Sequence, residues 1–441
     1  MIPDIERLRT PTYQGLLSQC VHCGLCLDSC PTYRLLGLEM DSPRGRIALM
    51  RAASDARFEI EDIRQNFSRH IDQCLACRAC EAICPSGVRY GMLVEQARVV
   101  KERNHPPGTA ESFLRWLGLK QLMPYPGRLR LAAGLVRIYQ SIGLQALVRR
   151  WRFLPPSLQT MESLLPPIQA PVPQRRLASQ TTAGRGVVLF FTGCIQEGFL
   201  KPVNEATCRV LEKNGFQVLQ PKNQTCCGAA QVHIGDLEQA RKLARQNIDS
   251  FLATGEPQAI LCNAGGCGLA LKEYGHLLVD DPRYAEAARL FSSRVQDVHA
   301  FLAEHLFTPP TRVISARVTY ADSCHLRNGQ KVIEQPRELL RRVPGIELIE
   351  LEHPEQCCGS AGVYNIAHPE IAVQILQAKL EDIAASGAEI VAVSNTGCHL
   401  QLLAGARQAG QPFRVMHVME ILDWSYQKQG LPNPGRYKAA C

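Results

Sequence analysis

Cysteine is the residue type with the clearest chemical potential in this chain, and it occurs in two runs of identical spacing. The runs are Cys20-x2-Cys23-x2-Cys26-x3-Cys30-Pro31 and Cys74-x2-Cys77-x2-Cys80-x3-Cys84-Pro85. Cysteine triplets of this kind ligate cubane [4Fe–4S] clusters, and the trailing cysteine of each run ligates the other cluster. We therefore predict one cluster on Cys20, Cys23, Cys26 and Cys84, and a second on Cys74, Cys77, Cys80 and Cys30.

This spacing is that of bacterial two-cluster ferredoxins, and two other interpretations are weaker. Four sulfurs in a tetrahedral site also suit zinc. Zinc ribbons, however, use pairs of cysteines and not triplets with a trailing Cys-Pro. A disulfide framework would require an oxidising compartment.

The C-terminal half contains an internal repeat of cysteines. Cys194 is followed after 31 residues by Cys226-Cys227-Gly228, and after 39 more by Cys267. Cys324 is followed after 32 residues by Cys357-Cys358-Gly359, and after 39 more by Cys398. Each first and last cysteine follows a short apolar run, which is typical of a buried strand. The repeat predicts two similar lobes, each with four thiols brought together.

Apolar runs alternate with helix-like segments in both repeats, which indicates β-α-β units. The expected helices are 201–214, 236–253, 335–342 and 369–386. Ligands of open α/β sheets lie at the carboxyl ends of the strands, where this spacing puts the cysteines. We therefore expect an α+β multidomain protein. A mainly helical, ferredoxin-like N-terminal domain with two [4Fe–4S] sites is followed by two repeated α/β lobes.

The N-terminal domain is placed at residues 1–105, with a charged helical stretch at 44–64. A basic helical segment and a proline-rich linker occupy 106–180, and the lobes occupy 181–309 and 310–430. From Arg115 to Met161 there is no Asp or Glu, but there are eight Arg or Lys. Apolar residues repeat at helical spacing there. This helix either lies on an anionic membrane surface or packs on its own domain or a partner; the apolar residues are Leu131, Leu135, Ile138 and Ile142.

Length and composition bound the remaining possibilities. A chain of 441 residues predicts more than one domain. The first ten residues have no apolar signal segment, and no stretch approaches 18 uncharged apolar residues. Nineteen cysteines without a secretory signal favour reduced, metal-binding thiols and a cytoplasmic location. The formal charge of +8 comes from scattered basic residues without a nucleic-acid motif, so no nucleic-acid partner is expected.

The doubled Cys-Cys-Gly units resemble the CCG domains of heterodisulfide reductase, anaerobic glycerol-3-phosphate dehydrogenase and glycolate oxidase. The ferredoxin-type runs followed by two such units resemble the iron–sulfur subunit of glycolate oxidase over nearly the whole chain. The stretches that carry this resemblance are 21–26, Cys30-Pro31-Thr32-Tyr33, 42–46, Cys84-Pro85-Ser86-Gly87-Val88-Arg89-Tyr90 and 357–362.

The resemblance implies an electron-transfer subunit with no activity alone. Such oxidases convert glycolate, and often D-lactate, to the 2-oxo acid. Their FAD lies on flavoprotein partners, and the iron–sulfur subunit passes single electrons towards a membrane quinone. This chain has no Gly-x-Gly-x-x-Gly fingerprint after a strand, so a flavin is expected on a partner. A location on the inner face of the cytoplasmic membrane is compatible with this role.

One departure from the disulfide-reducing relatives bears on an alternative function, the reduction of a thiol or disulfide substrate. Those relatives end each unit in Cys-x-x-Cys, whereas Ala264 and Asn395 stand three residues before Cys267 and Cys398. Four cysteines per unit suffice for a cubane cluster. They also leave open zinc, an empty site with reduced thiols, or a scaffold that only binds the flavoprotein.

Several further residues are candidates for secondary roles. Cys208 is expected to be a buried apolar thiol, Cys262 an additional ligand or a core residue, and Cys441 a terminal residue without a role. Four histidines next to ligand cysteines are expected to tune the clusters, namely His22, His233, His325 and His399. Arg44 and Arg46 either stabilise a reduced cluster or begin a solvated helix. No catalytic residues are predicted.

Overall fold

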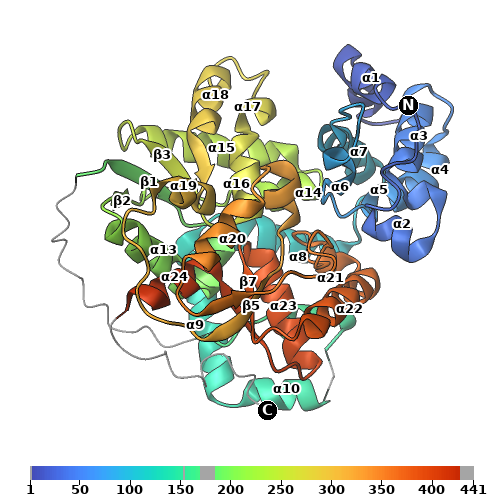
Figure 1. Ribbon diagram of the computed structural model, residues 1–441. Coiled ribbons are helices and arrows are strands. Elements are labelled where there is room, and N and C mark those ends of the chain that lie inside the picture. The colour runs from blue at the N-terminus through green and yellow to red at the C-terminus, as the bar shows by residue number, and fades with distance from the viewer. Residues whose placement is uncertain (1, 152–153, 169–183, 428–441) are drawn as a thin grey trace.

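The computed structural model describes residues 2–151, 154–168 and 184–427. A helical N-terminal region is followed by two α/β lobes with small parallel sheets, as the sequence predicts (Figure 1). Cys441 and the linker prolines Pro171 and Pro173 lie outside the described residues.

The N-terminal region is built from short helices around one apolar core that includes Leu8, Met50, Phe67 and Leu93. Cys30 is the N-cap of α2, so Pro31 begins a helix as soon as the cysteine run ends. The region comprises the 3-10 turns Ile5–Leu8 and Glu39–Asp41, α1 (Pro11–Ser18), α2 (Pro31–Leu36), α3 (Pro43–Ser54), α4 (Ile60–Asp62), the π-helical segment Ile63–Phe67, α5 (Ser68–Asp72), α6 (Ala79–Ala82) and α7 (Tyr90–Asn104).

The helical stretch expected over 44–64 is interrupted. Helix α3 ends at Ser54, and Ala56 takes a left-handed φ of 59°. The Arg57 amide then donates to the Ala52 carbonyl at 3.0 Å, which closes the helix in a Schellman-type turn. The next helix begins only at Ile60.

The middle segment contains α8 (Thr109–Arg115), the π-helical segment Trp116–Leu122, α9 (Pro126–Ser141), α10 (Leu144–Trp151) and α11 (Pro156–Ser163). Leu129 and Ala133 are the buried residues of α9, and Leu129 lies against Gly198 of the first lobe. The apolar stripe points elsewhere, because Leu131, Leu135, Ile138 and Ile142 are 56–68% exposed. Packing of this stripe on its own domain, one of the two expectations, is therefore wrong.

Each lobe contains a four-stranded parallel sheet with the same strand order. The first lobe has the order β2-β1-β3-β4 and the second has β6-β5-β7-β8, so each sheet is the other shifted by four strands. The strands are β1 (Val187–Phe191), β2 (Gln217–Leu219), β3 (Ala259–Cys262), β4 (Val295–Asp297), β5 (Ala316–Tyr320), β6 (Ile346–Leu348), β7 (Ile390–Val393) and β8 (Arg414–His417).

The helices of the lobes match the four predicted ones to within about one residue at each end. The first lobe has α12 (Cys194–Phe199), α13 (Lys201–Lys213), α14 (Ala229–His233), α15 (Leu237–Leu252), α16 (Gly265–Lys272), α17 (Tyr274–Leu277), α18 (Ala285–Arg294) and α19 (Val298–His305). The second has the π-helical segment His325–Gly329, α20 (Glu334–Arg341), α21 (Tyr364–Ala367), α22 (Pro369–Ser386), α23 (Thr396–Gln408) and α24 (Val418–Tyr426).

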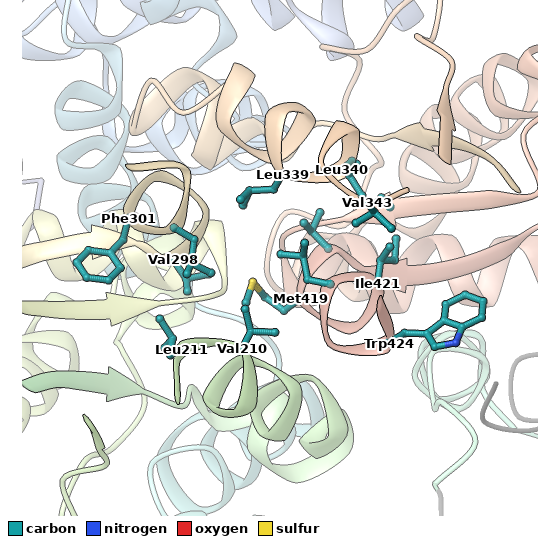
Figure 2. Packing of buried hydrophobic residues seen from close by; sticks show 14 of the residues in the cluster. Val210, Leu211, Val298, Phe301, Leu339, Leu340, Val343, Met419, Ile421 and Trp424 are labelled. Atoms are coloured by element: carbon teal, nitrogen blue, oxygen red, sulfur yellow. The ribbon is translucent and has the colours of Figure 1, made fainter. Parts of the chain in front are cut away.

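The two lobes share a single apolar core, which arises from the repeat itself. Helix α13 packs on α24, and α20 packs on α19, so equivalent helices exchange partners across the interface. Figure 2 shows this core, in which Val210 and Val298 of the first lobe face Leu339 and Met419 of the second. The lobes therefore hold each other at a defined orientation.

His417 crosses the lobe interface and must be neutral to do so. Its Nε2 donates to the Asn263 carbonyl at 2.8 Å, and its Nδ1 accepts from the Met419 amide at 3.2 Å. Burial lowers the pKa of His417 well below its ordinary value, and His299 lowers it further. A proton on Nδ1 would also remove the acceptor that the Met419 amide uses.

We predict that the protein loses stability as the pH falls below about 6.5, the ordinary pKa of histidine, because the unfolded chain then binds a proton that the folded chain excludes. His417→Gln should cost about 1–2 kcal/mol at neutral pH and should flatten this acid dependence. Thermal unfolding of both proteins between pH 5 and 8 measures the difference. An equally steep acid loss in the variant would contradict the assignment to His417.

Candidate metal centres

The first cavity of the N-terminal region is lined by Cys20, Cys23, Cys26 and Cys84. The first three lie in the loop between α1 and α2, and Cys84 follows α6. Cys23 is exposed and the other three are partly exposed, so this cavity lies close to solvent. The exposed side chains of Val21 and Leu25 flank it.

The second cavity is lined by Cys30, Cys74, Cys77 and Cys80. Cys30, Cys74 and Cys77 are no more than 8% exposed, so this cavity lies deeper than the first. Cys80 and Tyr90 line both cavities, which therefore adjoin. The structure thus gathers the same two sets of four cysteines that the spacing grouped, with the last cysteine of each run at the other cavity. Their role as ligands remains a prediction.

Hydrogen-bond donors surround the sulfurs of the second cavity. The Ala76 amide lies 3.3 Å from Cys74 Sγ, the Tyr90 hydroxyl 3.7 Å from the same sulfur, and the Thr32 hydroxyl 3.3 Å from Cys30 Sγ. Donors of this kind stabilise negative charge on sulfur and set the potential of a cluster. Burial raises the pKa of Cys77 and of Cys80. A bound cation would offset that effect, because metal ligands must be deprotonated.

Arg46 brings positive charge to the second cavity. It is 1% exposed, and its guanidinium lies 4.0 Å from Cys30 Sγ and 3.3 Å from Asp41 Oδ1. It also donates to the Thr32 hydroxyl and to the His70 carbonyl. Arg46 therefore does not begin a solvated helix. Arg44, by contrast, is partly exposed at the first cavity and pairs with Glu39 at 2.6 Å.

The cysteines of the first lobe form a continuous row of sulfurs at the carboxyl ends of β1 and β3. The Cys194 thiol donates to Cys226 Sγ at 3.5 Å. This bond, with a further bond from Cys227, lowers the pKa of Cys226 well below its ordinary value. Cys227 in turn hydrogen-bonds to Cys267. The four thiols grouped by the repeat therefore meet, and all but Cys267 are buried.

The second lobe repeats this row. Cys324 hydrogen-bonds to Cys357, and Cys357 to Cys358. The Cys358 thiol donates to Cys398 Sγ at 3.1 Å. Gly359 of the Cys-Cys-Gly corner has a φ of +80°, and a Cβ there would lie 2.6 Å from the Ala372 carbonyl oxygen. Gly228 has a φ of +86° in the first lobe, so the tight turn expected at each corner is present.

The thiols fit an iron–sulfur group in type and number at all four places. Among the described residues, no three His, Cys, Asp or Glu side chains converge as ligands of a single metal ion. A [4Fe–4S] cluster asks for a different arrangement, because each thiolate binds a different iron.

The second cavity lies directly against the cysteines of the second lobe. Cys77 and Cys357 belong to one buried cluster, with Cys324 packed on it, and the charge of Cys324 raises the pKa of Cys77. Asn328 donates to the Cys77 carbonyl at 2.9 Å, and the Tyr364 hydroxyl donates to the Gln73 carbonyl at 3.0 Å. This contact joins parts of the chain that are about 250 residues apart in sequence.

The N-terminal region contacts the first lobe through charged side chains. Arg78 pairs with Glu95 and Glu273, and Arg98 lies 3.3 Å from His233 Nδ1. His325 Nε2 hydrogen-bonds to the Ala76 carbonyl at 3.1 Å and its ring stacks on that of His233. His22 lines the first cavity, and His399 is buried beside Cys398. These four histidines thus lie near the predicted ligands, in positions around them and not in place of them.

Sequence reasoning assigned no role to Tyr90, Thr32, Arg78 or Arg98. Tyr90 and Thr32 are within the motifs that carry the family resemblance, so their positions were marked without a physical reason. Arg98 donates to the Cys74 carbonyl from a buried position on α7. Nothing in its sequence surroundings distinguishes it from other arginines.

Comparison with known proteins agrees with this geometry. A 4Fe-4S dicluster domain matches residues 16–88, and a cysteine-rich domain matches 188–272 and 318–403. The linker region of the glycolate oxidase iron-sulfur subunit matches 110–165. A probable glycolate oxidase iron-sulfur subunit from Bacillus subtilis is 39% identical over 93% of this chain and 94% of its own length.

The chain belongs to the family of glycolate oxidase iron–sulfur subunits. The Escherichia coli glycolate oxidase iron-sulfur subunit is 32% identical over 96% of this chain and 98% of its own. A relative outside that name, a fumarate reductase (CoM/CoB) subunit from Methanothermobacter marburgensis, is 27% identical over 96% of this chain and 75% of its own. The glycolate oxidase subunits therefore share the whole length of the chain, its middle segment included.

Proposed function

We propose that this protein is the iron–sulfur electron-transfer subunit of a flavin-dependent 2-hydroxy-acid oxidase that acts on glycolate or D-lactate. Electrons would come from FAD on partner flavoprotein subunits and leave through [4Fe–4S] clusters towards a quinone. The observation that carries the proposal is the pair of adjoining cavities, each lined by four cysteines drawn from both runs. Clusters bound there supply single-electron transfer.

The positions of the cysteines support a directional role. The first cavity lies near solvent beside exposed apolar residues, which suits contact with a redox partner. The second cavity adjoins the first and contacts the cysteines of the second lobe. Arg46, Tyr90 and Thr32 would hold negative charge on the ligands of the second cavity. The role of this chain is to hold and tune the centres, and the oxidation of the 2-hydroxy acid belongs to the partner.

The test uses anaerobically purified chain and its flavoprotein partners. Glycolate or D-lactate should reduce the EPR-visible clusters only when the flavoprotein is present, and the chain alone should not oxidise either acid. Absence of iron from the N-terminal region, or cluster reduction by the acid without the flavoprotein, would refute the proposal.

A second candidate is the reduction of a thiol or disulfide substrate at one of the lobes. The methanogen relative, whose name includes CoM and CoB, and a fifth cysteine beside the first-lobe row favour it. Turnover of a disulfide by the chain without the flavoprotein would support this candidate.

We also propose that α9 and α10 bind the anionic inner face of the cytoplasmic membrane. The helices present exposed apolar residues and arginines, and no acidic residue occurs between Arg115 and Met161. They lie at the end of the molecule opposite α1 (Figure 1). No single helix among the described residues is long and apolar enough to span a bilayer, although the bent pair Pro126–Ser141 and Leu144–Arg150 meets the length and composition together.

Ile138→Asp should weaken binding to vesicles that contain anionic lipid by roughly tenfold or more, because it removes one buried apolar side chain from the interface. Flotation with anionic and with zwitterionic vesicles measures this. Val373→Asp, at a residue that is 54% exposed on α22, is the matched control. Equal flotation of the two variants would contradict this orientation.

A further inference from the structure

Cys262 lies at the end of the first-lobe row of sulfurs. It is the last residue of β3, its side chain is fully buried, and it belongs to the same buried cluster as Cys194, Cys226 and Cys227. Its thiol is a hydrogen-bond partner of Cys267. The row in the first lobe therefore continues from Cys194 to a fifth sulfur.

The sheet holds this fifth sulfur rigidly. Cys262 pairs with Phe191 of β1 on one side and with Asp297 of β4 on the other. Because side chains alternate along a strand, Cys262 points to the same face as Ile260, the face that carries the cluster of cysteines. Ala259 and Leu261 point to the opposite face, into the core shared with the second lobe.

The second lobe differs at two equivalent positions. Its β7 ends at Val393, which cannot ligate a metal, where β3 ends at Cys262. Two residues later, Asn395 Nδ2 donates to Cys398 Sγ at 3.5 Å, whereas the first lobe has Ala264 there. The last cysteine of the row thus has a thiol as its neighbour in the first lobe and an amide in the second.

We infer that Cys262 is a fifth sulfur ligand of an iron–sulfur centre in the first lobe, and that the two lobes hold chemically different centres. The inference extends the proposed function, since it rests on an iron–sulfur centre in this lobe. A fifth thiolate adds negative charge next to Cys267, whereas the amide of Asn395 stabilises negative charge on Cys398 without adding any. The first-lobe centre should therefore have the lower reduction potential.

The test compares the full chain with three variants, all purified anaerobically. Cys262→Val introduces the residue that the second lobe has at this position. Cys208→Val replaces a partly exposed cysteine of α13, outside the row, as a matched control. Cys194→Ala removes a ligand of the first lobe, so its difference spectrum from the wild type isolates the EPR signal of that lobe.

Cys262→Val should change the line shape and raise the midpoint potential of this signal, and a chelator should remove the iron of this centre roughly tenfold faster. Cys208→Val should match the wild type. An unchanged signal, potential and rate of iron loss in Cys262→Val would overturn the inference. So would a Cys194→Ala variant with the full iron content of the wild type, because the first lobe would then hold no iron.

Misfolding is separated from ligand loss by a second replacement. Cys262→Ala should show the same spectral change as Cys262→Val, and the thermal unfolding of the N-terminal region should be unaltered in both. The proposed function is tested by the N-terminal clusters, whose reduction by the flavoprotein does not involve Cys262. Failure of the inference with intact reduction of those clusters therefore leaves the electron-transfer role standing.

Discussion

Replacement of Cys84 by alanine should remove the iron of the first cavity and spare that of the second. Cys84 lies in the second run of the sequence, yet it lines the cavity of Cys20, Cys23 and Cys26. A cubane cluster with three thiolates loses its fourth iron or the whole cube, because each corner needs a ligand. Iron content and EPR of the anaerobically purified variant measure this loss.

The reciprocal variant provides the control. Cys30→Ala should damage the second cavity, because Cys30 lies there with Cys74 and Cys77. The EPR spectrum of Cys84→Ala should resemble that of Cys23→Ala, and the spectrum of Cys30→Ala should resemble that of Cys77→Ala. The reverse grouping would show that each run holds its own cluster.

Arg46→Met should destabilise the N-terminal region by about 3–5 kcal/mol, because it leaves the buried carboxylate of Asp41 without its guanidinium partner. Burial alone would lower the pKa of Arg46, but the charges of Cys74, Cys30 and Asp41 raise it above its ordinary value, so the arginine stays charged. Denaturant unfolding of the variant against the wild type measures the loss in stability.

The same variant tests the electrostatic role of Arg46. Removal of a positive charge that lies 4.0 Å from Cys30 Sγ should make the second-cavity cluster harder to reduce, with a lower midpoint potential. Arg46→Lys keeps the charge and should keep most of the potential, although it loses the bidentate geometry. A potential that is unchanged in Arg46→Met would assign this arginine to stability alone.

Much of the architecture follows from local patterns. The helix Pro369–Ser386 was expected at the same residues, and the four predicted helices of the lobes all form. Apolar runs such as 187–191 and 390–393 form the predicted strands. Such patterns are reliable because the side-chain periods of 3.6 and 2 decide which face of each element is buried.

The break after α3 and the outward direction of the α9 stripe were not predictable in this way. Arg51 to Arg64 carries no Gly or Pro to mark the left-handed turn at Ala56. The spacing of Leu131 and Leu135 shows that an apolar face exists, but not what covers it. In the structure Leu129 and Ala133 face the first lobe, and the stripe faces solvent.

The grouping of the cysteines could be read from the chain, because cluster ligation imposes strict spacing on neighbouring residues and a proline that ends the loop. The contact of Cys77 with Cys324 and Cys357, the burial of Arg46 beside Cys30, and the fifth sulfur at Cys262 came only from the folded chain. Each of these joins residues that no local periodicity relates. The packing of the N-terminal region on the second lobe, and the alignment of strand ends within a sheet, bring them together.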